Sequence, residues 1–240
     1  MKDMREIYQD SDFIAQGERF DTKHTDKDCD GKWSEFKAFF LRFTDYKCPI
    51  CEKTIDNYDD IDHYRPKNAG YPFLKCKYQN YMIMCADCNR GYKRTYFPLY
   101  QESKKATCHE ELIEEQPLIA NPCIDNIYEL FELDFRVSVK GVKILVLIPH
   151  RDLSPDSYEY KKALETIRFY GLGDCDGTNE IKDCRISLLK GHYFIFNGLL
   201  EAFLKREEEL ENFNKVKNEV QNLNYGFYEF IKRNQFVVAL

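Results

Sequence analysis

Four cysteines stand in two C-x-x-C pairs, Cys48 with Cys51 and Cys85 with Cys88. Two such pairs can place four thiolates tetrahedrally about Zn²⁺, because each pair holds the ion from one tight turn. A single C-x-x-C could instead be a redox dithiol, but neither pair lies in a βαβ pattern. Two unrelated structural pairs are the other alternative. The doubled spacing favours a structural zinc, which would supply on the order of 10 kcal/mol of folding free energy.

The other six cysteines show no such spacing. The sequence predicts that they are buried or incidental thiols: Cys29, Cys76, Cys108, Cys123, Cys175 and Cys184. Cys108 is followed by His109, but one adjacent pair does not complete a metal-ligand set.

Between the two cysteine pairs lies an Asp62-His63 dipeptide with the side chains that phosphodiester hydrolysis needs. That reaction requires a water activated near neutral pH and neutralisation of charge at the phosphate. The ordinary pKa of histidine suits His63 as a general base, and Asp62 offers the hard oxygen that Mg²⁺ prefers. Neighbours on a strand face opposite sides, so the strand must bend or twist for the two to share a site. Pro66 fits a strand that stops there. The alternative is an ordinary surface pair.

The charge of the chain is unevenly distributed. The net charge is −6, from 35 Lys and Arg against 41 Asp and Glu, which argues against a general nucleic-acid coat. Residues 61–100 carry seven basic and two acidic side chains, a net +5, so the other 200 residues carry −11. This basic window suggests one anion-facing surface, with a solvated charged face as the alternative.

The order C-x-x-C, Asp-His-x-x-Pro, Asn, C-x-x-C-Asn-x-x-x-Lys resembles the HNH endonucleases, whose ββα-metal motif is often stapled by zinc. The resemblance implies that His63 is the general base and that Asp62 and Asn89 hold one Mg²⁺ or Mn²⁺. Asn89 stands where the family's last motif letter is usually His. Asn80 matches the middle Asn, which ties the loop backbone together and orients the histidine. Candidates for phosphate contact are Arg65, Lys67, Arg90 and Lys93, for which ordinary solvated charge is the alternative.

A narrower resemblance is to PtuB-type nucleases of Septu and retron anti-phage defence systems. It rests on residues 62–67, on 88–98, and more weakly on 118–122, 165–167 and 171–172. Tyr78 departs from the Trp expected there, and Gly173 from the expected Asn. The resemblance implies a bacterial defence role and a PtuA-like partner ATPase of the ABC/SMC type. The chain itself contains no G-x-x-x-x-G-K-[ST] motif.

Hydrophobic periodicity predicts an α+β protein. The predicted elements are a helix over 33–43, strands over 127–136 and 142–148, a helix over 156–170 and a helical region from about residue 180. Residues 1–31 are expected to be irregular. The predicted division is an N-terminal helical segment (1–46), an HNH module (47–100) and a mostly helical region (101–240) that offers a partner-binding surface.

No secretory signal and no apolar run long enough to span a membrane occurs, so a cytoplasmic location is expected. The predicted activity is cleavage of nucleic acid, DNA before RNA. The alternatives are an RNA-cleaving effector that acts on tRNA, a non-catalytic zinc module that binds nucleic acid or protein, and a thiol-redox protein using Cys48 and Cys51.

Overall fold

The computed structural model describes residues 1–24, 28–56, 59–137 and 143–173. Its helices and strands are α1 (Ser11–Lys23), α2 (Lys37–Thr44), β1 (Asp60–His63), β2 (Tyr81–Met84), α3 (Ile127–Leu130), β3 (Phe131–Val137), β4 (Lys143–Pro149) and α4 (Tyr158–Tyr170). Shorter helical turns are η1 (Arg5–Gln9), η2 (Lys32–Phe36), η3 (Pro72–Leu74), η4 (Tyr78–Asn80), η6 (Glu102–Lys104) and η7 (Glu110–Ile113), and η5 (Asp87–Lys93) is a π-helix. Within the described ranges no helix is long and apolar enough to cross a membrane.

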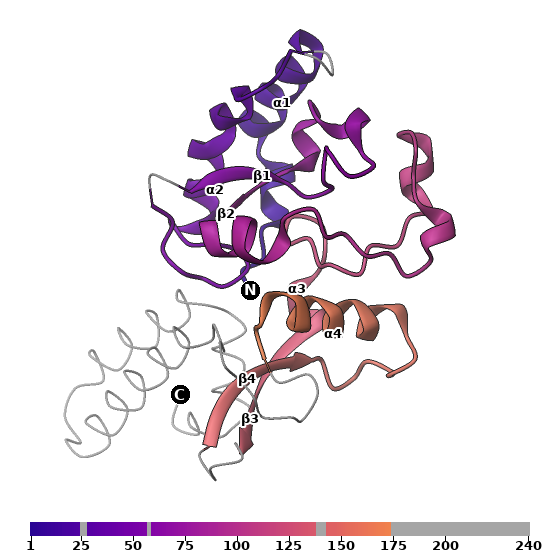
Figure 1. Cartoon of the computed structure of the whole chain (residues 1–240). Coiled ribbons are helices and arrows are strands. Elements are labelled where there is room, and N and C mark those ends of the chain that lie inside the picture. Colours follow the sequence, from indigo (N-terminus) through magenta and orange to yellow (C-terminus); the bar gives the residue numbers. More distant parts are fainter. Residues whose placement is uncertain (25–27, 57–58, 138–142, 174–240) are drawn as a thin grey trace, which may run out of the picture.

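The two N-terminal helices pack beside the first β-hairpin (Figure 1). The expectation that residues 1–31 are irregular is wrong, because α1 occupies residues 11–23. Its start is capped by the Asp10 carboxylate, which accepts a hydrogen bond from Phe13 N at 2.8 Å, and its buried face carries Phe13 and Phe20. The predicted helix over 33–43 is confirmed as the 3₁₀ turn η2 followed by α2.

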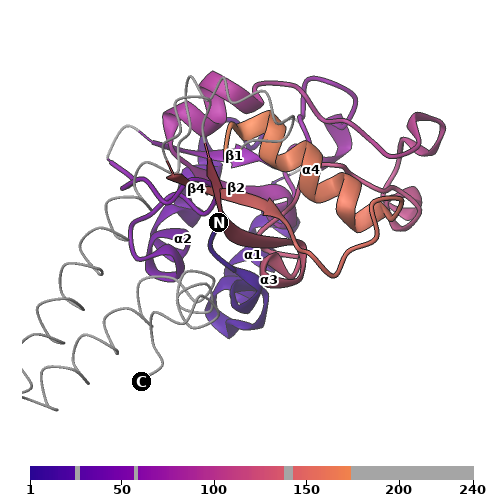
Figure 2. The same cartoon turned by 90° about the horizontal axis from the view of Figure 1, so that it is seen from below.

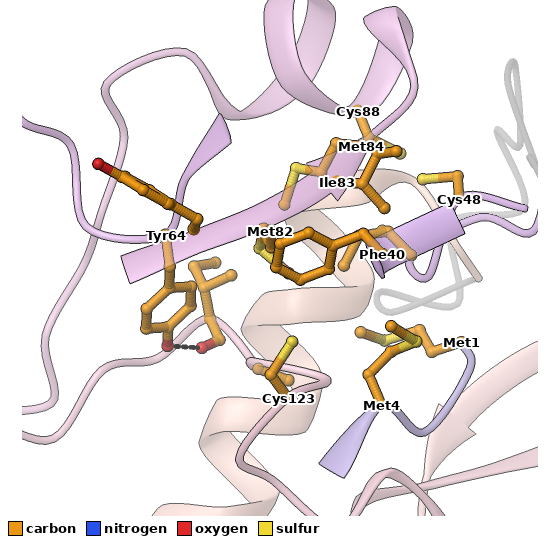
Figure 3. Packing of buried hydrophobic residues seen from close by; sticks show 14 of the residues in the cluster. Met1, Met4, Phe40, Cys48, Tyr64, Met82, Ile83, Met84, Cys88 and Cys123 are labelled. Atoms are coloured by element: carbon orange, nitrogen blue, oxygen red, sulfur yellow. Dashed lines mark hydrogen bonds between the residues drawn. The ribbon is translucent and has the colours of Figure 1, made fainter. Parts of the chain in front are cut away.

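Strands β1 and β2 form an antiparallel pair at the centre of the N-terminal half. The register aligns Asp62 with Met82 and His63 with Tyr81. Every residue of β2 is buried, and η5 begins three residues after β2 ends. In Figure 3, Phe40 of α2 packs near Met82 and Ile83 of β2, with Cys48 and Cys88 close to Met84. The hairpin is therefore held between α2 and the segment that carries the cysteines.

One cluster of buried apolar side chains extends from the N-terminal helices through the hairpin to α4. Four tyrosines between residues 64 and 81 are buried in the protein, so their rings are not free to stack on nucleic-acid bases: Tyr64, Tyr71, Tyr78 and Tyr81. The Tyr64 hydroxyl donates to the Ile119 carbonyl, the dashed line in Figure 3. A Cβ at Gly17 would lie 2.4 Å from the Tyr78 ring, so the close approach of α1 to that ring requires glycine.

The predicted hairpin near residue 140 is confirmed as β3 paired with β4, except that residues 127–130 form the short helix α3. The predicted helix over 156–170 is confirmed as α4, which is capped by Ser157 and ends at Gly171 with a φ of +62°. Figure 2 shows α4 lying along this hairpin. The structure is α+β, and the helical region predicted from residue 180 lies outside the described residues.

A disulfide joins Cys29 to Cys76. The prediction that both cysteines are buried is confirmed, but they are paired with each other and are not free thiols. They are 47 residues apart, and no local spacing marks them as partners. They meet because the turn before η2 packs against the loop between η3 and η4, which is a tertiary contact. The disulfide ties the N-terminal helices to the loop that follows β1.

Candidate functional site

The four cysteines of the two C-x-x-C pairs come together in one buried cluster, called here the four-cysteine cluster. Their sulfur atoms all lie within 4.8 Å of one another. The first pair sits on a tight turn closed by hydrogen bonds between Cys48 and Lys53 and between Glu52 and Cys48, both 2.8 Å. The second pair spans the end of β2 and the start of η5, where Asn89 N donates to Cys85 O at 3.0 Å.

This donor set fits zinc. Four sulfurs at about 2.3 Å from a tetrahedral Zn²⁺ lie about 3.8 Å apart, and the Sγ atoms of Cys51 and Cys85 are 3.6 Å apart. Burial raises the pKa of the Cys48 thiol well above its ordinary value, because an isolated buried thiolate is poorly solvated. A bound divalent cation would supply the charge that lets all four sulfurs ionise. The prediction that these residues could bind zinc together is therefore confirmed at the level of geometry.

His63 ends β1 and is 5% exposed. The Trp33 ring from η2 and the Tyr81 ring from β2 both meet it edge-on, at centroid distances of 4.9 and 5.1 Å. Lys67 then covers Trp33, with its Nζ 3.7 Å from the ring centroid. The base predicted from the sequence thus lies against two aromatic rings, Trp33 from the N-terminal segment and Tyr81 from β2.

The hydrogen bonding of His63 fixes its tautomer. Its Nε2 lies 2.9 Å from the Lys75 carbonyl oxygen. A carbonyl only accepts, so Nε2 carries the proton and Nδ1 keeps the basic lone pair. Burial lowers the pKa of His63 to about 4, and this outweighs the raising effect of the Lys75 hydrogen bond. A ring with this pKa is neutral at physiological pH and is a weaker base than an ordinary histidine, whose pKa lies nearer the working pH.

Asp62 contacts η5 through Lys93. Its Oδ2 lies 2.7 Å from Lys93 Nζ, which also donates to the His63 carbonyl oxygen at 2.7 Å. Burial raises the pKa of the Asp62 carboxyl, and the Lys93 ammonium opposes that rise. The carboxylate is thus already paired with one cation, the Lys93 ammonium. Its hard oxygen fits Mg²⁺ or Mn²⁺.

Asn80 binds the loop that follows β1. Its Oδ1 accepts from Arg65 N at 2.7 Å, and its Nδ2 donates to the carbonyl oxygens of Arg65 at 2.9 Å and Leu74 at 3.3 Å. The Asn80 main-chain carbonyl also accepts from Tyr64 N at 2.7 Å. These contacts are of the kind expected of a residue that ties the loop backbone together. Because Lys75 follows Leu74, they also position the carbonyl that orients His63.

Asn89 lies on η5, half-buried and four residues before Lys93. The Arg94 amide donates to its carbonyl oxygen at 2.8 Å, the long-range bond of a π-helix. Such π-turns are frequent at functional sites. Its helix thus contacts Asp62 through Lys93.

Many of the basic side chains in the window 61–100 already hold a carboxylate. Arg65 binds the buried Glu115 at 2.6 Å, and that carboxylate also accepts from the Tyr71 hydroxyl and the Ala106 amide. Three lysines bind carboxylates, in the pairs Lys75–Asp30, Lys77–Asp21 and Lys93–Asp62. Among the four residues predicted to contact phosphate, Arg90 is exposed and Lys67 is half-buried on Trp33. Three of these carboxylates come from outside the window, so they offset three of its five net positive charges: Glu115, Asp30 and Asp21.

Sequence reasoning missed three contributors to the site: Trp33, Tyr81 and the Lys75 carbonyl. The sequence shows only that Tyr81 follows Asn80, and the strand register of the folded protein is what places it opposite His63. Trp33 is the single tryptophan of the chain. Its position over His63 depends on the fold and on the nearby disulfide, which no local pattern reveals.

The fold and the site define an α+β protein with a β-hairpin and a four-cysteine cluster that could bind zinc. No family model matches the chain, and no solved structure matches it. The chain is similar to Septu protein PtuB from Bacillus mycoides strain KBAB4, with 29% identity over 205 residues. The match covers 77% of this chain and 63% of that protein, so it spans less than two thirds of the relative's length. The relationship to PtuB-type proteins predicted from the sequence is confirmed.

Proposed function

We propose that the chain is a metal-dependent nuclease of the HNH type that acts as the effector of an anti-phage defence complex. One observation carries the proposal. His63 Nε2 is committed to the Lys75 carbonyl oxygen, so Nδ1 is left as the basic nitrogen, and Asp62, which is paired with Lys93, directly precedes His63 on β1. The relationship to Septu protein PtuB supports the defence role.

Each residue then has a distinct task. His63 Nδ1 takes the proton of the attacking water, and Asn80 keeps the loop and the Lys75 carbonyl in place so that this atom stays oriented. Asp62 and Asn89 would hold the catalytic Mg²⁺ or Mn²⁺. When bound, that ion would polarise the phosphate and stabilise the leaving 3′ oxygen. In-line attack yields a 5′ phosphate and a 3′ hydroxyl.

The substrate proposed is DNA before RNA. Arg90, which is exposed, and Lys67, which lies over the Trp33 ring, are the side chains proposed to meet the phosphates. The partner proposed is a PtuA-like ATPase of the ABC/SMC type. Because His63 is 5% exposed, substrate binding would move Trp33 aside.

The burial of His63 under Trp33 also favours a second candidate, a non-catalytic zinc module that binds nucleic acid or protein. In that case Trp33 never moves aside and His63 is a core residue. The two candidates differ in whether replacement of His63 abolishes an activity.

The test is cleavage of duplex DNA, single-stranded DNA and bulk tRNA by the zinc-loaded full chain. Each reaction is run with Mg²⁺, with Mn²⁺ and with chelator, alone and with a co-expressed PtuA-like ATPase. The proposal predicts divalent-dependent cutting that leaves 5′ phosphates, with DNA preferred. Binding to a substrate without cutting under every condition would favour the non-catalytic module, and preferred cutting of tRNA would favour the RNA effector.

A further inference from the structure

Lys93 is one of the most deeply buried charged side chains in the described part of the protein, at 1% exposed. It ends η5, and the next residue turns the chain away with a φ of +48° at Arg94. A lysine that only met a nucleic-acid phosphate would be expected at the surface, because burial of an unpaired ammonium is costly. Its position inside the protein requires another explanation.

Both resolved contacts of the Lys93 ammonium are with β1. Nζ is 2.7 Å from Asp62 Oδ2 and donates to the His63 carbonyl oxygen at 2.7 Å. Asp62 Oδ2 is a buried oxygen, and the ammonium supplies its countercharge. The same ammonium thus neutralises the carboxylate proposed to hold the metal and fixes η5 against the strand that carries the proposed base.

A divalent ion bound to Asp62 and the ammonium on its Oδ2 would compete for the charge of one carboxylate. Both are cations, and at neighbouring positions on a buried carboxylate they repel strongly because the surroundings screen little charge. Mg²⁺ also demands close oxygen ligands in a near-octahedral arrangement, and an ammonium at 2.7 Å from Asp62 Oδ2 takes up part of the space around that carboxylate.

We infer that Lys93 is a built-in counter-ion that occupies Asp62 until the divalent metal displaces it. This inference rests on the proposed metal-dependent function and assigns Lys93 a positioning role in it. Lys93 keeps the site folded without metal, weakens metal binding, and on displacement frees an ammonium beside the substrate phosphate. The phosphate contact predicted for Lys93 from the sequence would then form only after the metal has displaced its ammonium from Asp62.

The experiment is a Mn²⁺ titration of the zinc-loaded full chain, followed by the electron paramagnetic resonance signal of free Mn²⁺. Lys93→Met and Lys93→Gln remove the charge, and glutamine keeps the capacity to donate to both oxygens. Each is expected to bind Mn²⁺ at least tenfold more tightly than the wild type. Lys93→Arg should bind as weakly as the wild type, and Lys77→Met, which removes a lysine paired with a carboxylate elsewhere, should not differ from it.

Asp62→Asn in the Lys93→Gln background shows whether Asp62 is the ligand of the added Mn²⁺, because it should abolish the tight binding. If both neutral variants bind Mn²⁺ no better than the wild type while Asp62→Asn weakens binding, the counter-ion role is wrong and the nuclease proposal stands. If no protein shows binding that depends on Asp62, the metal centre itself is wrong and the inference falls with it.

A measurement on the unmodified protein covers the case in which neutral variants fail to fold. The ¹⁵Nζ resonance of Lys93 is expected to show slow proton exchange without metal and to lose that protection at saturating Mg²⁺. Protection that survives saturation would overturn the inference.

Discussion

Replacement of Asn80 by alanine tests how the loop after β1 is held. The side chain is buried and makes three hydrogen bonds, to Arg65 N, Arg65 O and Leu74 O. A hydrogen bond of this kind contributes about 1 kcal/mol net, and a partner left unsatisfied costs more. Asn80→Ala is therefore expected to lower the free energy of unfolding by about 3 kcal/mol.

The assay is urea unfolding of the zinc-loaded chain, with Asn68→Ala as the matched control. Asn68 is an exposed residue of the same type in the same loop and should change the stability by less than about 0.5 kcal/mol. Amide exchange gives a local readout, because the Arg65 amide loses its acceptor and should exchange faster by about two orders of magnitude. An Asn80→Ala protein as stable as the control, with a protected Arg65 amide, would refute the proposed role of the side chain.

The buried Glu115 accepts three hydrogen bonds, so Glu115→Ala should lower the free energy of unfolding in urea by about 3 to 5 kcal/mol. The exposed control Glu114→Ala should lower it by less than about 1 kcal/mol, and equal effects would contradict the ion-pair network. The disulfide closes a loop of about 50 residues, so the Cys29→Ala/Cys76→Ala variant should have a free energy of unfolding lower by about 4 kcal/mol. If both cysteines of the wild type can be alkylated without reductant, the disulfide is absent. An unfolded histidine protonates near pH 6.5 and His63 only near pH 4, so the unfolded state binds more protons between these values. Acidification from pH 6.5 to 4 should thus remove about 3 kcal/mol of stability, and an NMR titration that gives His63 an ordinary pKa would contradict this. Removal of zinc from the four-cysteine cluster should remove on the order of 10 kcal/mol of folding free energy and unfold the β1–β2 pair. A protein that binds no zinc would contradict the assignment of the cluster as a zinc site.

Local patterns predicted the features that depend on neighbours in the chain. Each C-x-x-C pair forms a turn by itself, so only the contact between the two turns depends on the tertiary structure. Helix α4 could be predicted because its apolar residues recur at helical spacing up to Gly171, and a glycine readily adopts the left-handed conformation that ends a helix. The role of Asn80 was inferred from the resemblance to HNH enzymes, and its contacts in the structure agree with that role.

The remaining features depend on contacts between distant segments. Lys93 reads as an ordinary charged residue until η5 is folded against Asp62. Glu115, 50 residues away along the chain, neutralises Arg65, so a charge count over a window overestimates the free cationic surface. Helix α1 was missed although Asp10 caps it, because its apolar positions are sparse among charged ones.

The central claim, that His63 is the base of a metal-dependent nuclease, is tested most directly by chemical rescue. Cleavage rates in Mg²⁺ or Mn²⁺ are compared for the wild type, His63→Gly and the exposed-site control His109→Gly, each with its zinc and with the PtuA-like partner present. The account predicts that His63→Gly loses at least a hundredfold in rate, that added imidazole restores part of it, and that His109→Gly cuts normally. A folded His63→Gly protein that cuts at the wild-type rate would contradict the role of His63 as the base. A wild-type complex that cuts no nucleic acid would contradict the nuclease activity itself.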